Sequence, residues 1–332
     1  MSTQIEFGHA EQSAAWRLIE LALAEDLNAN IEMAQIDFGQ VFTMTTFDSS
    51  QAPIASLPSE LDHDLTCAAL VGQSEAATID VTIRRDGVLA GAAIAELVFE
   101  RLDPTVSWQT LLNDGDVVRP GDVVARVEGP LRSLLIGERT ALNFLMHLSG
   151  VATQTRQYVD AVAGTKAVIL DTRKTLPGWR LLEKYAVRCG GGTNHRMGLS
   201  DGVLIKDNHL AAWMASTDSE SRSIAAAVRQ ARNRSPKGVS IEVEVDTLEQ
   251  LRDALAGSPD IVLLDNMGPP QLRDAVKLRD QLAGSVLLEA SGGITLANVR
   301  EIAECGVDRI SVGALTHSAP ALDIAFDWHV GL

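Results

Sequence analysis

Cationic side chains gather in one stretch of the sequence, between Thr165 and His209. The part from Lys166 to His209 holds eight Lys or Arg and four Asp or Glu residues, a net charge of +4 in a chain whose formal total is −16. Everything outside that part therefore sums to −20. A cationic stretch in an acidic chain predicts a small anionic ligand, because nucleic acid would need a wider positive field.

Several of these cations stand at the ends of short apolar runs that are typical of strands. One run, Ala167–Leu170, precedes a pair of cations, and another, Val203–Ile205, precedes a lysine. Arginine's planar fork suits carboxylates and lysine's point charge suits phosphates, so such a pocket could hold a di- or tricarboxylate. The candidates are Arg173, Lys174, His195, Arg196 and Lys206, with Arg139 as a further candidate that could equally pair with Glu138 on its own helix.

Apolar runs alternate with helical patterns from about Gly150 to Leu315. Such alternation predicts a parallel α/β sheet, and the apolar character of each run predicts burial on both faces. Every run ends in polar residues or glycine, which favours a barrel over a doubly wound sheet, and no dinucleotide or P-loop motif is present. Because the runs are too few for a full barrel, we expect an open, incomplete one. The predicted strands are Ala167–Leu170, Val203–Ile205, Val239–Val245, Ile261–Leu264, Val286–Glu289 and Arg309–Val312.

Carboxylates and glycines end the later runs. Glu244 and Asp265 could pair with the lysines or hold Mg²⁺ against a phosphorylated substrate, and the sequence leaves both alternatives open. Glycine-rich loops follow the last two strands at Ser291-Gly292-Gly293 and Ser311-Val312-Gly313-Ala314, where phosphate sites recur in barrels. The residues alone therefore predict an enzyme that binds a phosphate ester and a polycarboxylate at one barrel mouth.

The first 150 or so residues predict a separate domain. Apolar spacing indicates a helix over Ala14–Leu27, whereas residues 28–63 are acidic and show no sustained period. Alternation over Ala76–Arg84 predicts a strand, and Asp86-Gly87 predicts a tight hairpin after it. Short Val-rich strands within residues 112–130 complete a small antiparallel β-layer.

Composition argues against several classes of partner. A pI near 4.8 and an aromatic content of 4% oppose binding to nucleic acid or to an anionic membrane surface. No apolar run approaches the roughly 18 residues of a membrane span. Three separate cysteines, Cys67, Cys189 and Cys305, predict buried thiols in a reducing compartment, and the N-terminus lacks the pattern of a secretory signal. We expect a cytoplasmic protein that binds neither nucleic acid nor membrane.

Segments in and around the cationic stretch resemble the nicotinate-nucleotide pyrophosphorylase family, also named quinolinate phosphoribosyltransferase (decarboxylating). The first matching segments are E-R-T-A-L-N-F-L (138–145), L-D-T-R-K-T (170–175), E-K-Y-A-V-R-C-G-G-G (183–192) and I-K-D-N-H (205–209). Later ones are I-E-V-E-V-D (241–246), L-L-D-N-M (263–267), E-A-S-G-G-I (289–294) and S-V-G-A-L-T-H-S (311–318). The resemblance runs from Leu65 to the C-terminus, and the motifs are specific as a set.

This resemblance implies an N-terminal α/β sandwich followed by an open α/β barrel, the type II phosphoribosyltransferase architecture. We expect the sandwich in residues 1–150, the catalytic barrel in 151–318, and a C-terminal helix in 319–332 that packs back on the N-terminal domain. The family passes almost directly from A-L-x-E-D-L to D-L-T, whereas 36 residues intervene here, at 28–63. We expect this acidic insertion to leave catalysis intact.

The resemblance also implies a reaction and a set of roles. Quinolinate and 5-phosphoribosyl 1-diphosphate would react, with Mg²⁺, to give nicotinate mononucleotide, diphosphate and CO₂. Quinolinate would contact Thr172, Arg173, His195, Arg196 and Lys206, with Arg139 reaching in from the partner subunit of a homodimer that could assemble further. Lys174, Glu244 and Asp265 would be catalytic, and the two carboxylates would hold Mg²⁺ directly or through water. The phosphoribosyl substrate would contact Lys174, Lys206, Glu244, Asp265, Ser291, Gly292, Gly293, Val312, Gly313, Ala314 and His317.

Two other functions compete with this one. A phosphoribosyltransferase for a monocarboxylate such as nicotinate is the first, but a monocarboxylate does not require Arg139, Arg173, Arg196 and Lys206 together. A non-catalytic carrier is the second, because G-D-V-V-R-P-G-D-V (115–123) resembles a lipoyl-type sandwich. That segment lacks a lysine at its turn to carry lipoate or biotin, which argues against a carrier.

Overall fold

The computed structural model describes residues 5–27, 64–216 and 222–329 of the 332-residue chain. The acidic insertion expected at 28–63 lies outside the described residues. The chain folds as two compact units. The first unit comprises Met1–Thr153, Pro177–Cys189 and Pro320–Leu332, and the second comprises Gln154–Leu176 and Gly190–Ala319.

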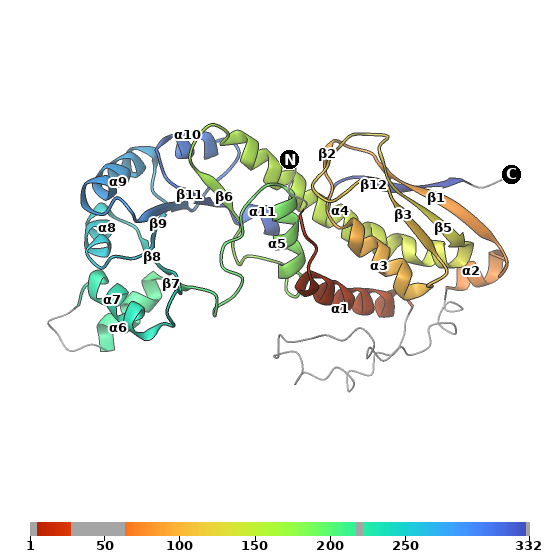
Figure 1. The fold of residues 1–332 in the computed structure, drawn as a ribbon, viewed down its shortest axis with the longest axis horizontal. Helices are drawn as coiled ribbons and strands as arrows, with labels where there is room; N and C mark the ends of the chain where they lie inside the picture. The colour runs from red at the N-terminus through yellow and green to blue at the C-terminus, as the bar shows by residue number, and fades with distance from the viewer. Residues whose placement is uncertain (1–4, 28–63, 217–221, 330–332) are drawn as a thin grey trace. The chain divides into compact units, whose positions relative to one another are not determined.

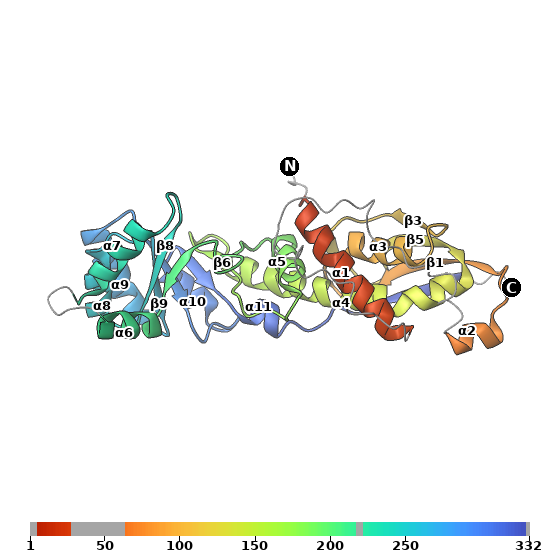
Figure 2. The same ribbon diagram turned by 90° about the horizontal axis from the view of Figure 1, so that it is seen from below.

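The first unit is built on a four-stranded antiparallel sheet and several helices. Its strands are β1 (Ala76–Ile83), β2 (Gly87–Val88), β3 (Ser107–Thr110), β4 (Val117–Val118), β5 (Val123–Pro130) and β12 (Ile324–His329), and its helices are α1 (His9–Asp26), α2 (Leu65–Leu70), α3 (Ala92–Leu102), α4 (Leu131–Ala161, which runs on into the second unit) and α5 (Arg180–Cys189). The strand order of the main sheet is β12-β1-β5-β3. Phe99 of α3 stacks on Trp108 and on Phe326, so aromatic side chains join this helix to the sheet. Helix α1 packs against α3 and α5 (Figure 2).

The predicted hairpin at Asp86-Gly87 is wrong. Strand β1 pairs with β5 on one side and with β12 on the other, so both of its edges are occupied. Strand β2 pairs instead with β4, through Gly87 opposite Val118 and Val88 opposite Val117. Pairing between strands distant in sequence has overridden the local turn signal, as is common for strands.

The predicted C-terminal helix is also wrong, because residues 324–329 form β12. Ile324 and Phe326 are buried, while Ala325 and Asp327 between them are partly exposed, which is the two-residue period of a strand. The segment nevertheless belongs to the first unit, where its register sets Ile324 opposite Ile83. The apolar alternation that ends the chain was a strand signal.

The second unit is a parallel α/β sheet of six strands in the order β6-β11-β10-β9-β8-β7. The strands are β6 (Val168–Leu170), β7 (Val203–Ile205), β8 (Ile241–Val245), β9 (Ile261–Asp265), β10 (Leu287–Ser291) and β11 (Arg309–Ser311), and the helices are α6 (Asp207–Ser216), α7 (Ile224–Arg234), α8 (Leu248–Leu255), α9 (Pro269–Leu282), α10 (Val299–Glu304) and α11 (Ala314–His317). Helices α7, α8 and α9 lie on the outer side of the curved sheet (Figure 1). The predicted parallel α/β fold of the open-barrel type is confirmed.

Local sequence explains how these helices begin. Thr247 caps α8 by accepting the Gln250 N–H, and the Gln250 side chain accepts in return from the Thr247 N–H, which satisfies two otherwise unpaired donors.

The three cysteines are buried and unpaired, which confirms the prediction of buried thiols. Within the described part of the chain, none of the helices combines the length and apolarity needed to cross a bilayer.

Candidate active site

The carboxyl ends of the six parallel strands meet at one edge of the second unit. In the register, Asp265 lies opposite Ser291, and Ser311 lies opposite Leu170. Residues that directly follow the strands are therefore neighbours in space although they are far apart in sequence. The predicted residues of the second unit come together at this edge.

Asp171, directly after β6, organises the first part of the edge. Its carboxylate is fully buried and accepts the His195 N–H at 2.8 Å and the Asn194 side-chain amide at 2.6 Å. Thr193 forms a parallel bridge with Leu170 just before them. These bonds hold the Asn194-His195-Arg196 segment beside the end of β6, next to the predicted cations of the neighbouring loop.

Arg173 and Arg196 lie close enough for their charges to interact. Burial, and then the charge of Arg173, lower the pKa of Arg196. Arg196 is held by a bond from its guanidinium to the Gly202 carbonyl at 2.9 Å. The Nε of Arg173 is buried and has no hydrogen-bond partner among the described residues. Two neighbouring guanidinium groups, one with a buried unused donor, are suited to an anion that bridges them.

Lys206 and Glu244 form an ion pair at the ends of β7 and β8. The Glu244 side chain is only 13% exposed, so solvent screens this pair less than a surface pair. On the next strand, Asp265 accepts a bond from the Asn266 side-chain amide at 2.7 Å. Of the partners that the sequence allows for Glu244, Lys206 is one that the structure places beside it.

The predicted phosphate loops follow β10 and β11. A Cβ at Gly292 would lie 2.2 Å from Asn266 Oδ1, so only glycine fits there, and Gly293 faces open space. Lys174 and His317 flank Gly313, because a Cβ at Gly313 would lie 3.1 Å from Lys174 Cδ and 3.2 Å from His317 Nε2. The structure therefore brings Lys174 and His317 to the same glycine loop.

Four other predicted residues are placed less simply. Thr172 turns its hydroxyl oxygen to the Lys174 N–H at 3.0 Å, which shapes the loop after β6. Val312 is buried and its N–H already donates to the Leu170 carbonyl at 2.9 Å, so that donor is not free for phosphate. The Ala314 carbonyl accepts from the Gln154 side chain at 2.8 Å. Arg139 belongs to the first unit, where it is exposed on α4.

A buried charged cluster beneath the edge was missed by sequence reasoning. Nε2 of His195 lies 3.2 Å from Glu242 Oε2 and 3.4 Å from Glu289 Oε1. Arg309 completes the cluster, with its Nε donating to Glu289 Oε2 at 2.7 Å. The available signal was a glutamate within each of two apolar strands, I-E-V-E-V and L-L-E-A-S. Buried carboxylates are costly unless they are paired, so their presence inside the sheet indicates a positioned partner.

This cluster holds a proton and is not suited to a metal ion. Burial opposes a charged imidazole, but the nearby carboxylates of Glu242 and Glu289 outweigh it and raise the pKa of His195 to about 9. Burial also raises the pKa of Glu242. The His195 Nδ1 accepts the Arg196 N–H at 2.8 Å, so the shared proton lies between Nε2 and the carboxylates. A metal on Nε2 would need a proton on Nδ1, where the Arg196 N–H already points.

We expect Glu289→Gln to lower the free energy of unfolding by about 3 kcal/mol, since it leaves Arg309 without its buried counter-charge. A matched control is Glu304→Gln, which removes the negative charge from the Arg300–Glu304 pair, where Nε and Oε1 are 2.6 Å apart and the side chains are 50% and 54% exposed. The control should cost less than about 0.5 kcal/mol. Urea unfolding measures both, and equal losses would contradict the role of the buried pair.

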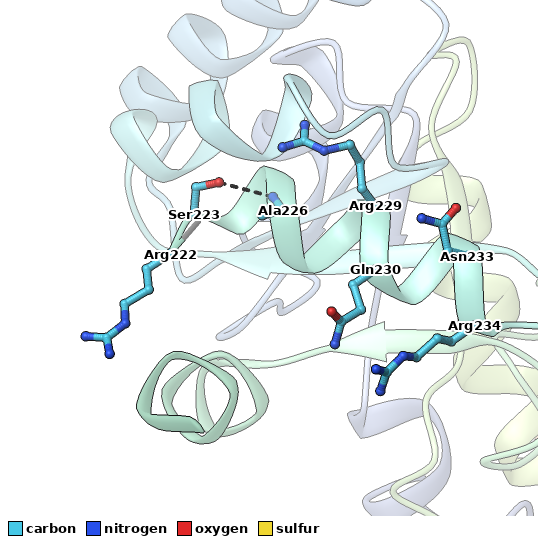
Figure 3. A pocket seen from close by; sticks show the side chains of 7 residues that line it. All are labelled: Arg222, Ser223, Ala226, Arg229, Gln230, Asn233 and Arg234. Carbon is cyan, nitrogen blue, oxygen red and sulfur yellow. Dashed lines mark hydrogen bonds between the residues drawn. The ribbon is translucent and has the colours of Figure 1, made fainter. Parts of the chain in front are cut away.

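A pocket lies elsewhere in the second unit, along α7. It is lined by Arg222, Ser223, Ala226, Arg229, Gln230, Asn233 and Arg234. Figure 3 shows the three arginines pointing in different directions, and Arg229 donates to the Ala256 carbonyl. A ligand site needs polar groups that converge on one point. The strand ends meet that requirement better than the α7 pocket does.

Two family models together match most of the chain. Residues 64–149 match "Quinolinate phosphoribosyl transferase, N-terminal domain", and residues 151–327 match "Quinolinate phosphoribosyl transferase, C-terminal domain". The chain belongs to the quinolinate phosphoribosyltransferase family. The C-terminal model covers every strand end described above, from β6 to β11.

Named members of the quinolinate phosphoribosyltransferase family match over most of their length. The nicotinate-nucleotide pyrophosphorylase [carboxylating] of Mycobacterium leprae (strain TN) is 47% identical over 266 residues, which are 80% of this chain and 90% of that protein. The probable enzyme of Bacillus subtilis (strain 168) is 44% identical over 264 residues, 80% and 87% of the two chains. The structure of the nicotinate-nucleotide pyrophosphorylase from Francisella tularensis has a TM-score of 0.77 at 33% identity, covering 99% of this chain and 100% of that one.

A more distant structure is that of an enzyme named for the competing acceptor. Human nicotinic acid phosphoribosyltransferase is 14% identical, with a TM-score of 0.55 over 80% of this chain and 72% of that chain. This likeness shows a common fold alone. The choice between a mono- and a dicarboxylate acceptor therefore depends on the quinolinate phosphoribosyltransferase family match and on the cations at the strand ends.

Proposed function

We propose that this protein transfers phosphoribosyl from 5-phosphoribosyl 1-diphosphate to quinolinate with loss of CO₂. The transfer to quinolinate is the reaction for which its family is named. It is a step of de novo NAD biosynthesis. The observation that carries the proposal is the Arg173–Arg196 pair, with its buried unused Nε. Quinolinate carries two carboxylates on adjacent ring carbons, so each of the two guanidinium groups can bind one carboxylate. Lys206 is positioned by Glu244 at the next strand end, so it adds a third cation to the same edge.

The geometry supports a dissociative transfer. As the ring nitrogen of quinolinate bonds to C1 of the ribose, the C1–O bond to diphosphate breaks and positive charge develops at C1. Glu244 and Asp265, on adjacent strands, are fixed carboxylates that can stabilise this charge without reorganising. Much of the remaining rate enhancement comes from holding the two reactants in line, which the arginine pair and the glycine loops can do.

Decarboxylation needs little further machinery. After transfer, the ring nitrogen carries a positive charge beside the carbon that bears the 2-carboxylate. The electron pair released with CO₂ remains at that carbon next to the cationic nitrogen and then takes up a proton. One of the two arginines would still hold the 3-carboxylate, which stays in nicotinate mononucleotide.

Mg²⁺ fits the donor set of this edge. Glu244 and Asp265 offer the oxygen ligands that Mg²⁺ prefers, and such sites commonly combine one or two carboxylates with substrate phosphates. When bound, Mg²⁺ supplies positive charge for the diphosphate leaving group. The Lys206–Glu244 pair leaves one Glu244 oxygen outside the ion pair, so metal and lysine can share this carboxylate.

We also propose a homodimer in the cytoplasm, in which the exposed Arg139 enters the site of the partner subunit. Arg139 is exposed on α4, where a partner subunit could receive it, and a dicarboxylate site gains from a further cation. The buried unpaired thiols support a reducing compartment.

The test is an assay of the purified protein with 5-phosphoribosyl 1-diphosphate and Mg²⁺, offering quinolinate or nicotinate as the acceptor. We expect nicotinate mononucleotide and CO₂ from quinolinate, and a kcat/KM for nicotinate lower by about 10³-fold or more, because the arginines would then face one carboxylate fewer. Comparable turnover of nicotinate would favour the monocarboxylate enzyme instead.

A further inference from the structure

Asn266, directly after β9, has an unusual backbone. Its φ is 53°, and only Ser258 shares a positive φ among the described residues other than glycine. Asparagine tolerates this region better than most residues, but the conformation still costs energy, and strain of this kind gathers at functional sites. The left-handed turn must therefore serve contacts that a relaxed backbone would lose.

Those contacts reach both halves of the proposed phosphoribosyl site. The Asn266 N–H donates to the Ser291 carbonyl at 2.9 Å, and its side-chain amide donates to Asp265 Oδ2 at 2.7 Å. Its Oδ1 fills the space beside Gly292, where a Cβ would lie only 2.2 Å away. Asp265 belongs to the ribose and metal side of the site, and Gly292 belongs to the phosphate loop.

We propose that Asn266 is a positioning residue that fixes the Asp265 carboxylate and the Ser291-Gly292-Gly293 loop relative to each other, so that ribose and phosphate are held in one geometry. It acts through Asp265 and the loop and does not itself react. The Asn266 amide bonds to Oδ2 of Asp265 and leaves Oδ1 outside this bond. The bond to Oδ2 fixes the orientation of the carboxylate, and with it the direction of Oδ1. This inference rests on the proposed function, because it assigns a role in binding the phosphoribosyl substrate.

The test is Asn266→Gly, because glycine adopts the positive φ without strain while the amide is lost. We expect the KM for 5-phosphoribosyl 1-diphosphate to rise about 10-fold or more, as is typical when a supporting partner of a ligand-holding carboxylate is removed. The KM for quinolinate should stay within about 2-fold, since the arginine pair is untouched. A purely structural role would lower stability without this split between the two substrates.

Two further variants sharpen the result. Asn266→Asp keeps the side-chain shape but sets a second carboxylate against Asp265. Its KM for 5-phosphoribosyl 1-diphosphate should therefore rise more than that of the glycine variant. Ser258→Gly changes the other positive-φ residue and should leave both KM values unchanged. Wild-type protein that makes no product would contradict the proposed function itself. An active wild type with an unchanged KM for 5-phosphoribosyl 1-diphosphate in Asn266→Gly would overturn only the role of Asn266.

Discussion

Arg173→Ala should lower kcat/KM for quinolinate by about 10²–10³-fold, because truncating one member of a desolvated charge pair typically costs 2–5 kcal/mol. The buried Nε of Arg173 has no protein partner in the described structure, so it is the donor that the proposed substrate would use. Arg173→Lys keeps the charge but loses the planar fork, and should recover only part of the activity. Steady-state kinetics with quinolinate varied measures all three proteins.

A matched control is Arg234→Ala, which removes an exposed arginine of the α7 pocket in the same unit (Figure 3). It should retain wild-type kinetics. Wild-type kcat/KM in Arg173→Ala would contradict the dicarboxylate site. Mixing inactive Arg173→Ala and Arg139→Ala proteins extends the test, because a symmetric dimer that shares Arg139 regains an intact site only in mixed dimers. Mixed dimers are about half of all dimers and hold one intact site each, so about a quarter of all sites should recover. Absence of recovery after subunit exchange would place Arg139 outside the partner's site.

Glu244→Gln should lower kcat by about 10²-fold or more, because it removes a fixed negative charge from beside the developing cation at C1. The variant also frees Lys206 from its ion pair, so the KM for quinolinate should not rise. Glu249→Gln, at an exposed position in the first turn of α8, is the control and should behave as wild type. A higher KM for quinolinate with an unchanged kcat would show that Glu244 serves binding and not the transition state.

Several strand-end charges were predictable because they lie at, or within a few residues of, the end of an apolar run. Parallel strands must bring their carboxyl ends to one edge, so local sequence and topology together placed Arg173, Lys206, Glu244 and Asp265 near one another. The direction of each side chain was not predictable. The Lys206–Glu244 pair depends on the β7–β8 register, which sequence leaves open.

Other features depend on contacts between distant segments. The glutamates in β8 and β10 fit a half-exposed strand as well as a buried one, and only the approach of His195, held by Asp171, shows why they are buried. The segment D-N-M does not predict that Asn266 adopts a left-handed backbone conformation or that its side chain packs against Gly292. The C-terminal strand is different, since the alternation of Ile324 and Phe326 was present in the sequence and indicated β12.

Release of labelled CO₂ tests the central claim most directly. Quinolinate carrying ¹⁴C in its 2-carboxylate is incubated with the protein, 5-phosphoribosyl 1-diphosphate and Mg²⁺, and a parallel reaction uses label in the 3-carboxylate. We predict ¹⁴CO₂ equimolar with nicotinate mononucleotide from the first substrate, and label retained in the nucleotide from the second. Nucleotide formed without ¹⁴CO₂ from the 2-carboxylate, or no nucleotide from quinolinate at all, would contradict the account.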